Sequence, residues 1–363
     1  MPPLAPLPQI RFAQSISQLV PGKFIYLVLL QNGETVVVKN DNHQRDDATV
    51  AHAFQTMAQL SPGGESRLLE PVEVDELRTL VNLHIADDLL LGRATPPYVT
   101  DLDDALNRSQ HSKWVKMRQV ANLTTLADAV AALRTDAANR KDGVRAFAKL
   151  LNEGHGLEAL GRMIAIDAYN HNLDRFDPTL LMMKDLGAPG QEVAVQDGPT
   201  RTSRRVLVNS GNVFSTLQQN RNRLVALDNY DPSNGFSITR TVAEQERAAV
   251  GLWAGWILQE NPRAKRWRKL YSEYIALDLD EALGGRNRRF AFLKQTRLDS
   301  NAPHRLRTGF KAGMEMLRTS LARAHRSQAG AFGAATRGTV LAGLEDRYRI
   351  LVLGEGNPLG RAA

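Results

Sequence analysis

Four short segments of the chain carry, in order, a lysine, an aspartate, an asparagine and a second aspartate. They are Val36-Val37-Val38-Lys39, Asn172-Leu173-Asp174-Arg175, Gly211-Asn212-Val213-Phe214 and Leu227-Asp228-Asn229. Phosphoryl transfer uses a cation that holds phosphates, a carboxylate that orients the attacking hydroxyl and oxygen ligands for Mg²⁺. The order of the four segments therefore favours ATP-dependent phosphoryl transfer.

Each segment taken alone is also typical of an ordinary soluble domain. Lys39 could be a solvent-facing lysine at a strand end, Asp174 and Arg175 a surface pair in a helix C-terminal turn, and Asp228 a turn residue. Asn209 lies near Asn212 and is an alternative metal ligand. Only the combination in one order favours the catalytic interpretation.

The elements expected around these residues follow from apolar patterning. An apolar run at 24–30, the Asn-Gly turn signal at 32–33 and the run at 35–39 predict a β-hairpin. Helical spacing predicts helices over about 47–60, from a Thr124 or Thr125 cap to about 172, and over about 241–327. Short strands are expected at 114–117, 206–217 and 223–227, and residues 61–112 are mixed in pattern. Trp253, Trp256 and Ile257 are expected in the core. Strands thus dominate the first third, and helices dominate the rest.

These motifs resemble the kinase-like fold, in its phosphatidylinositol kinase-like and HipA-like branch. The matching residues are Asn172-Leu173-Asp174-Arg175 for the catalytic loop, Leu227-Asp228 for the metal-binding strand end and Val36-Val37-Val38-Lys39 for the lysine strand. The resemblance implies an α+β, two-lobed protein, with a small β-rich N-lobe and a large, mainly helical C-lobe. The expected boundaries are a Pro-rich leader at 1–10, an N-lobe at 11–113, a hinge at 114–121, a C-lobe at 122–329 with an inserted loop at 177–205, and a tail at 330–363.

The resemblance also assigns roles, with ATP and Mg²⁺ as cofactors. Lys39 would hold phosphates, and Asp174 and Arg175 would form the catalytic loop. Asn212 and Asp228 would bind the metal. The hinge residues Lys116, Met117, Arg118 and Gln119 would meet the adenine through their backbone.

The sequence departs from the family pattern at three places. Phe176 stands where the family has a histidine. The family's asparagine a few residues further on is absent, and Asn212 can take its place only if a loop of about 30 residues has been inserted between them. The acidic partner of Lys39 is open among Asp41, Asp46, Asp47, Glu70 and Glu73. If none of them pairs with Lys39, activity would require an activating partner, or the protein would be a non-catalytic scaffold.

Composition narrows the remaining classes. The chain has 363 residues, a net charge of +7 and no cysteine, which excludes disulfides, thiol catalysis and cysteine-based zinc sites. It has no apolar run of about 18 residues and no Sec-type signal pattern at its start. Basic clusters at 263–269 and 286–297 are expected to be solvated helix faces, because no nucleic-acid-binding module accompanies them.

The functional expectation is an atypical protein Ser/Thr kinase that acts as a bacterial effector or toxin. It would be cytoplasmic, or secreted into a host or target cell without a Sec signal. A protein substrate is favoured, with a lipid head group as the alternative acceptor. The rival interpretations are a lipid kinase, an AMP-transferring enzyme of the same fold, a pseudokinase scaffold and a nucleic-acid binder.

Overall fold

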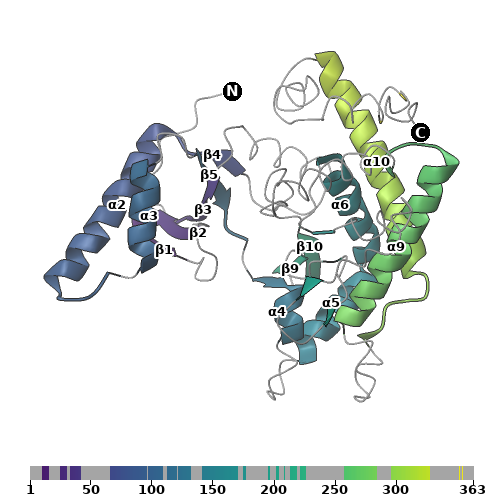
Figure 1. Cartoon of the computed structure of the whole chain (residues 1–363), viewed down its shortest axis with the longest axis horizontal. Coiled ribbons are helices and arrows are strands. Elements are labelled where there is room, and N and C mark those ends of the chain that lie inside the picture. The colour runs from purple at the N-terminus through teal and green to yellow at the C-terminus, as the bar shows by residue number, and fades with distance from the viewer. Residues whose placement is uncertain are drawn as a thin grey trace. The chain divides into compact units, whose positions relative to one another are not determined.

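The structure, a computed structural model, divides into two compact units (Figure 1). Unit 1 comprises Met1–His52 and Pro62–Val120, and unit 2 comprises Ala53–Ser61 and Ala121–Ala363. The residues that it describes are 10–15, 25–30, 33–41, 66–95, 97–108, 113–120, 122–131, 141–170, 175–176, 195–196, 202–203, 208, 213–218, 221–225, 257–283, 296–327, 351 and 354. The chain is α+β, as expected from the sequence.

Unit 1 is built on a five-stranded antiparallel sheet in the order β1-β2-β3-β5-β4. Its elements are β1 (Ile10–Ser15), β2 (Ile25–Leu30), β3 (Thr35–Asp41), β4 (Ser66–Leu68), α2 (Pro71–Leu90), α3 (Pro97–Arg108) and β5 (Lys113–Arg118). The predicted hairpin is confirmed, since β2 and β3 pair antiparallel and Gly33 has a φ of +83°. A positive φ in the turn is what the Asn-Gly signal requires.

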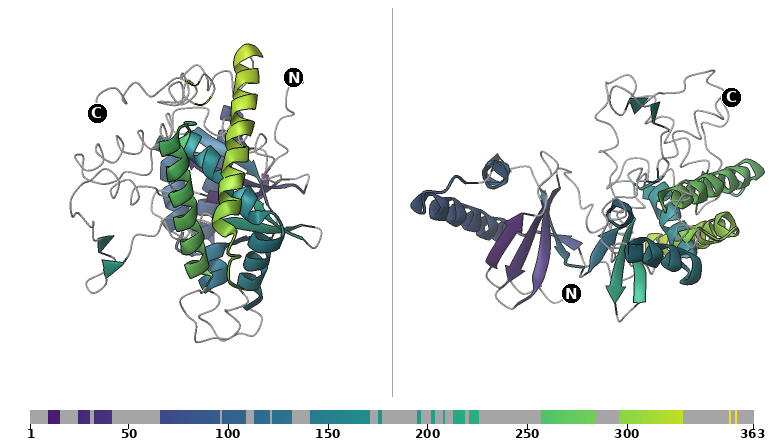
Figure 2. Two further views of the ribbon diagram at one scale, coloured as in Figure 1. Left: turned by 90° about the vertical axis from the view of Figure 1, so that its right-hand side faces the viewer. Right: turned by 90° about the horizontal axis from the view of Figure 1, so that it is seen from below.

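One face of this sheet is covered by α2 and α3 (Figure 2). Val28, Val36, Val38 and Trp114 of the strands share a buried apolar cluster with residues of the two helices. The helical members are Leu77, Val81, Val99, Leu102 and Leu106. The expectation of a strand-dominated lobe is thus corrected, because the two helices hold about as many residues as the strands. The mixed pattern of 61–112 concealed α2, because this helix is apolar on two opposite faces.

Unit 2 is mainly helical. It contains β6 (Leu123–Thr125), α4 (Leu126–Ala131), α5 (Lys141–Glu153), α6 (Gly156–Asn170), β7 (Val195–Gln196), β8 (Thr202–Ser203), β9 (Phe214–Gln218), β10 (Arg221–Val225), α9 (Pro262–Ala282) and α10 (Ala302–Ser327). Its sheets are β10-β9-β6 and the two-stranded β7-β8. The latter is what the structure describes of the predicted loop at 177–205.

The centre of unit 2 is α6, which packs along α10, with α9 beside α10 (Figure 1, Figure 2). The predicted helical stripe of Leu157, Leu160, Ile164 and Ala168 is confirmed, since each side chain is at most 1% exposed. The two helices approach closely because Gly161 on α6 and Gly309 on α10 lie at their contact. A Cβ on Gly309 would lie 2.1 Å from the Glu158 carbonyl oxygen.

Helix boundaries follow local signals. Thr125 caps α4, because its Oγ1 accepts a hydrogen bond from the Asp128 amide at 2.9 Å, which selects Thr125 over Thr124. The prediction of one continuous helix over 241–327 is wrong, because the described residues form α9 and α10 with the non-helical residues 297–301 between them. The Asn261 side chain caps α9, and the sequence Gly284-Gly285 follows its end.

Other predictions on this part of the chain have mixed outcomes. Ile257 is buried as expected, whereas Trp253, Trp256 and the helix predicted at 47–60 lie outside the described residues. The expected solvated face of α9 is confirmed at its exposed cations, Arg263, Lys265, Arg266 and Lys269. Arg268 is the exception, because it is buried and donates hydrogen bonds to the carbonyls of Ile257 and Gln259.

Candidate active site

Lys39 lies on β3, an inner strand of the unit 1 sheet with β2 on one side and β5 on the other. Side chains alternate between the two faces of a strand. Val36 and Val38 belong to the cluster under α2 and α3, so Lys39 and Val37 belong to the opposite face. The predicted lysine strand is therefore present, and Lys39 lies on the face that α2 and α3 do not cover.

The residues of this second face are half-buried, and those between Thr35 and Lys39 are apolar. Leu27, Leu29, Thr35, Val37 and Lys39 are all partly exposed, in contrast to the fully buried Val28, Val36 and Val38. The register pairs Leu27 with Val37 and Leu29 with Thr35. The result is an apolar surface with an ammonium group at one end of it.

The predicted hinge is mostly strand. Lys116 and Met117 belong to β5, which pairs with β3 on one side and with β4 on the other. Because inner-strand backbone groups are used by two neighbours, these two residues have little backbone capacity left for a base. Pairing with β4 ends at Met117, and the Gln119 amide donates to the Thr35 carbonyl at 3.4 Å. Arg118 pairs with β3 alone. Its backbone is therefore the best placed of the four hinge residues to bind a base.

Lys116 does not share a face with Lys39. The register pairs Lys116 with Val38, whose side chain is in the cluster under the helices, whereas Lys39 pairs with Val115. Residues directly opposite each other on antiparallel strands point to the same face. The side chains of the two lysines therefore lie on opposite faces of the sheet, and Lys116 is ruled out as a side-chain ligand at the surface of Lys39.

Two of the acidic residues considered as partners of Lys39 form the start of α2. Glu73 is 3% exposed, and its carboxylate accepts a hydrogen bond from the Glu70 amide at 2.7 Å. The Glu70 side chain in turn accepts a hydrogen bond from the Glu73 amide, and the two bonds together form a capping box. Asp41 ends β3, two residues after Lys39, and Asp46 and Asp47 lie outside the described residues.

Arg175 is buried in unit 2. Its guanidinium Nη1 lies 3.3 Å from Asp167 Oδ2 on α6, and the two side chains are 1% and 2% exposed. Phe176 is also held, because the Tyr271 hydroxyl on α9 donates to its carbonyl oxygen at 3.0 Å. The burial of Arg175 excludes the surface pair considered from the sequence, and its contact with Asp167 makes it a positioning residue.

Asp167 and Tyr271 were missed by the sequence interpretation. A carboxylate within the apolar stretch Ile164-Ala165-Ile166-Asp167-Ala168 is a signal that could have revealed the first, since buried charges are paired. No local signal marks Tyr271, whose contact with Phe176 spans 95 positions of the chain.

Asp174, Asn212 and Asp228 lie outside the described residues, as do Asn209 and Gly211. Their described neighbours, however, are paired with one another. Phe176 forms a β-bridge with Val208, and Phe214 pairs with Val225 at one end of the β9–β10 ladder. Val213 is also fixed, since its carbonyl accepts from the Leu126 amide at 2.9 Å.

The three predicted residues are close in sequence to these pairs. Asn212 is two residues before Phe214, and Asp228 is three residues after Val225. Asp174 is two residues before Phe176.

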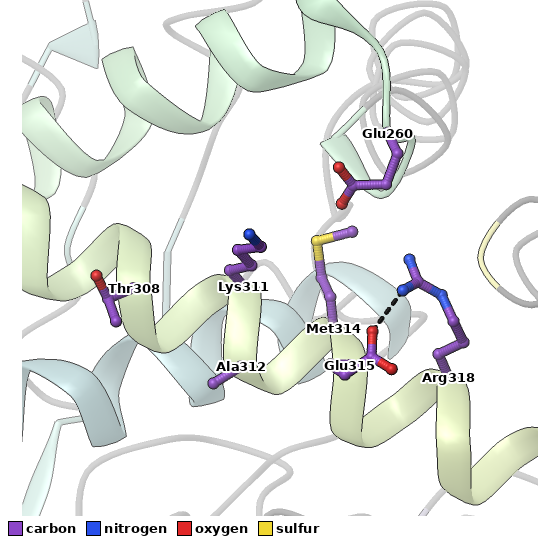
Figure 3. Close-up of a pocket in the computed structure, with 7 residues that line it drawn as sticks. All are labelled: Glu260, Thr308, Lys311, Ala312, Met314, Glu315 and Arg318. Carbon is purple, nitrogen blue, oxygen red and sulfur yellow. Dashed lines mark hydrogen bonds and ion pairs between the residues drawn. The ribbon is translucent and has the colours of Figure 1, made fainter.

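A cavity of about 370 Å³ also lies in unit 2, along α10 (Figure 3). It is lined by Glu260, Thr308, Lys311, Ala312, Met314, Glu315 and Arg318. The Arg318 guanidinium is already paired with Glu315 and with the Leu351 carbonyl. None of the predicted site residues lines this cavity.

Among the described residues, no group of three or more His, Asp or Glu side chains could hold a metal ion. No helix in the described part of the chain is long and apolar enough to cross a membrane. Comparisons of the chain with protein-family models, curated proteins and solved structures find no match.

Proposed function

We propose that the chain is an ATP- and Mg²⁺-dependent phosphotransferase of kinase-like architecture that acts on a protein hydroxyl. One observation carries the proposal: the Phe176–Val208 bridge and the Phe214–Val225 pair connect the chain segments that flank Asp174, Asn212 and Asp228. The bridge joins positions 32 apart in the chain, whereas the Phe214–Val225 pair belongs to the β9–β10 hairpin. In this proposal Asp174 orients the acceptor hydroxyl, and Arg175 holds the loop through Asp167.

The proposed metal ligands are chemically suited to Mg²⁺. The ion prefers oxygen ligands, takes one or two carboxylates from the protein and keeps water and phosphate oxygens as its other ligands. Asp228 would supply a carboxylate and Asn212 an amide oxygen. Bound Mg²⁺ would neutralise charge on the transferred phosphoryl group.

The sheet of unit 1 offers a second support. A half-buried apolar surface suits a planar base, and a lysine at its edge suits phosphates. Lys39 on β3 provides this combination together with Leu27 and Val37.

Exchange of the two sheet lysines tests nucleotide binding. Wild-type protein at an ATP concentration 100 times Kd, with Mg²⁺, should gain about 2.7 kcal/mol of stability, seen as a higher melting temperature. Lys39→Met should weaken Mg²⁺–ATP binding at least tenfold, because the phosphates lose their cation. Lys116→Met is the matched control and should bind as wild type does, because Lys116 belongs to the opposite face.

Equal weakening in both lysine variants would contradict the assignment of Lys39. If saturating Mg²⁺–ATP does not change the melting temperature of the wild-type protein, the enzyme proposal is contradicted and a non-catalytic scaffold is favoured.

Turnover tests the unit 2 residues. Asp174→Ala and Asp228→Ala should each lower the transfer of labelled γ-phosphate to the chain itself and to casein at least tenfold, since hydroxyl orientation or metal binding is lost. Glu153→Ala, which removes an exposed carboxylate of α5, should retain wild-type activity. Equal transfer by all four proteins would refute the mechanism, and the mass of the modified acceptor would distinguish phosphate from AMP.

A further inference from the structure

Helix α2 has an apolar stripe on the side opposite its buried face. Leu77 and Val81 point into the cluster with the sheet, whereas Val72, Leu83 and Leu90 are 59%, 56% and 83% exposed. At about 100° per residue, these three exposed residues lie within about 20° of one another around the helix axis. They form a single line along the helix.

Small side chains complete this line. Thr79 and Ala86, both exposed, fall between the larger residues, so that 72, 79, 83, 86 and 90 follow the seven-residue spacing of a helix–helix seam. We call these five residues the α2 stripe. Leu89 and Leu91, which are 71% and 63% exposed, widen the apolar surface at its C-terminal end.

The charge around the stripe indicates what covers it. Within α2 there are five acidic residues, of which Glu73 is buried at the helix start, and one arginine. Helix α3 has three acidic residues and one arginine, in a chain whose net charge is +7. Asp75 and Asp87 are both exposed on α2, and Arg78 is already paired with Asp75 and the Leu106 carbonyl. The two helices are thus an acidic layer in a basic protein.

This charge disfavours several occupants. Anionic lipid and nucleic acid would be repelled by the acidic residues. A second copy would bring another helix with the same acidic excess against α2, which is a like-charge contact. A basic helix meets no such repulsion.

We propose that the α2 stripe binds an amphipathic helix of a partner protein, with apolar residues at the seam and lysine or arginine on its flanks. Helix recognition through anchors at such spacing is a recurrent mode of peptide binding. The flanking charges would set orientation and selectivity, and the leucines would supply the contact area. This surface is independent of the proposed phosphotransfer and of its residues.

Two designed helical peptides of about 20 residues, long enough to match α2, test the surface. Both carry leucine and alanine at the seam, with lysine on the flanks of one and glutamate on the flanks of the other. The full-length chain should bind the lysine peptide at least tenfold more tightly than the glutamate peptide in fluorescence anisotropy. The preference should shrink as salt is raised, because exposed charges are screened.

Variants locate the binding. Leu83→Ser combined with Leu90→Ser should weaken lysine-peptide binding at least tenfold, and its helical content should be unchanged because both residues are exposed. Leu277→Ser is the matched control, since Leu277 is a 47% exposed leucine on α9, and it should bind as wild type does. Equal binding by the double variant and wild type, or a preference for the glutamate peptide, would overturn the proposal. A wild-type dimer that becomes monomeric in the double variant would also overturn it, by showing that a second copy occupies the stripe.

Discussion

Asp167→Ala is expected to lower the free energy of unfolding by about 3–5 kcal/mol, because it leaves the Arg175 guanidinium charged and buried without this carboxylate. The pair is 3.3 Å apart, and the side chains are 1% and 2% exposed. Urea unfolding followed by tryptophan fluorescence measures the loss. Because Arg175 follows Asp174 directly, phosphoryl transfer should fall as well.

A second variant separates burial of the charge from loss of the contact. The double variant Asp167→Ala, Arg175→Ala should lose less stability than the sum of the two single variants, since no charge remains buried. If the double variant loses as much stability as the two single variants together, the two side chains do not interact in the folded protein.

A partly exposed ion pair on the same helix is the control for this prediction. Arg305 donates to both carboxylate oxygens of Glu158 at 2.8 Å, and the side chains are 16% and 21% exposed. Glu158→Gln should cost only about 1 kcal/mol, because exposed pairs contribute little. The hydrogen bonds from Arg305 also hold the pKa of the Glu158 carboxyl below its usual range. The stability from this pair is therefore present at neutral pH, and is lost as the pH falls through the lowered pKa.

Gly309→Ala is expected to destabilise the chain by about 3 kcal/mol, although alanine is the better helix former. The new Cβ would lie 2.1 Å from the Glu158 carbonyl oxygen and 2.7 Å from its Cα, so α6 and α10 must separate. These contacts are with backbone, which cannot rotate away as a long side chain can. The unfolding free energy in urea measures the effect.

Gly143→Ala is the matched control for this substitution. A Cβ on Gly143 of α5 would lie 3.5 Å from Ala129 Cβ, which is an ordinary contact. This variant should be neutral or up to about 1 kcal/mol more stable, because alanine favours the helix. Equal destabilisation of both variants would argue against close packing of α6 on α10.

Local signals were sufficient for several elements. The turn at Gly33, the cap at Thr125 and the buried stripe from Leu157 to Ala168 depend on residues a few positions apart, and each is present. The same reasoning failed for α2, where Leu83 and Leu90 on one side and Leu77 and Val81 on the other cancel the single-face pattern of a helix. It also failed between α9 and α10, because the helical spacing was given more weight than the Gly284-Gly285 stop signal that follows α9.

The sequence by itself determined which residue types are available: Lys39 on a strand, Arg175 after Asp174, an amide at Asn212 and a carboxylate at Asp228. Only the tertiary structure decided the surroundings of Lys39 and Arg175. The face of Lys39 relative to Lys116 depends on the β3–β5 register, and the partner of Arg175 depends on how its loop returns to α6. The contact of Gly309 with Glu158 joins residues on two separate helices. Such contacts are set by the packing of whole elements, whose energies local propensity does not contain.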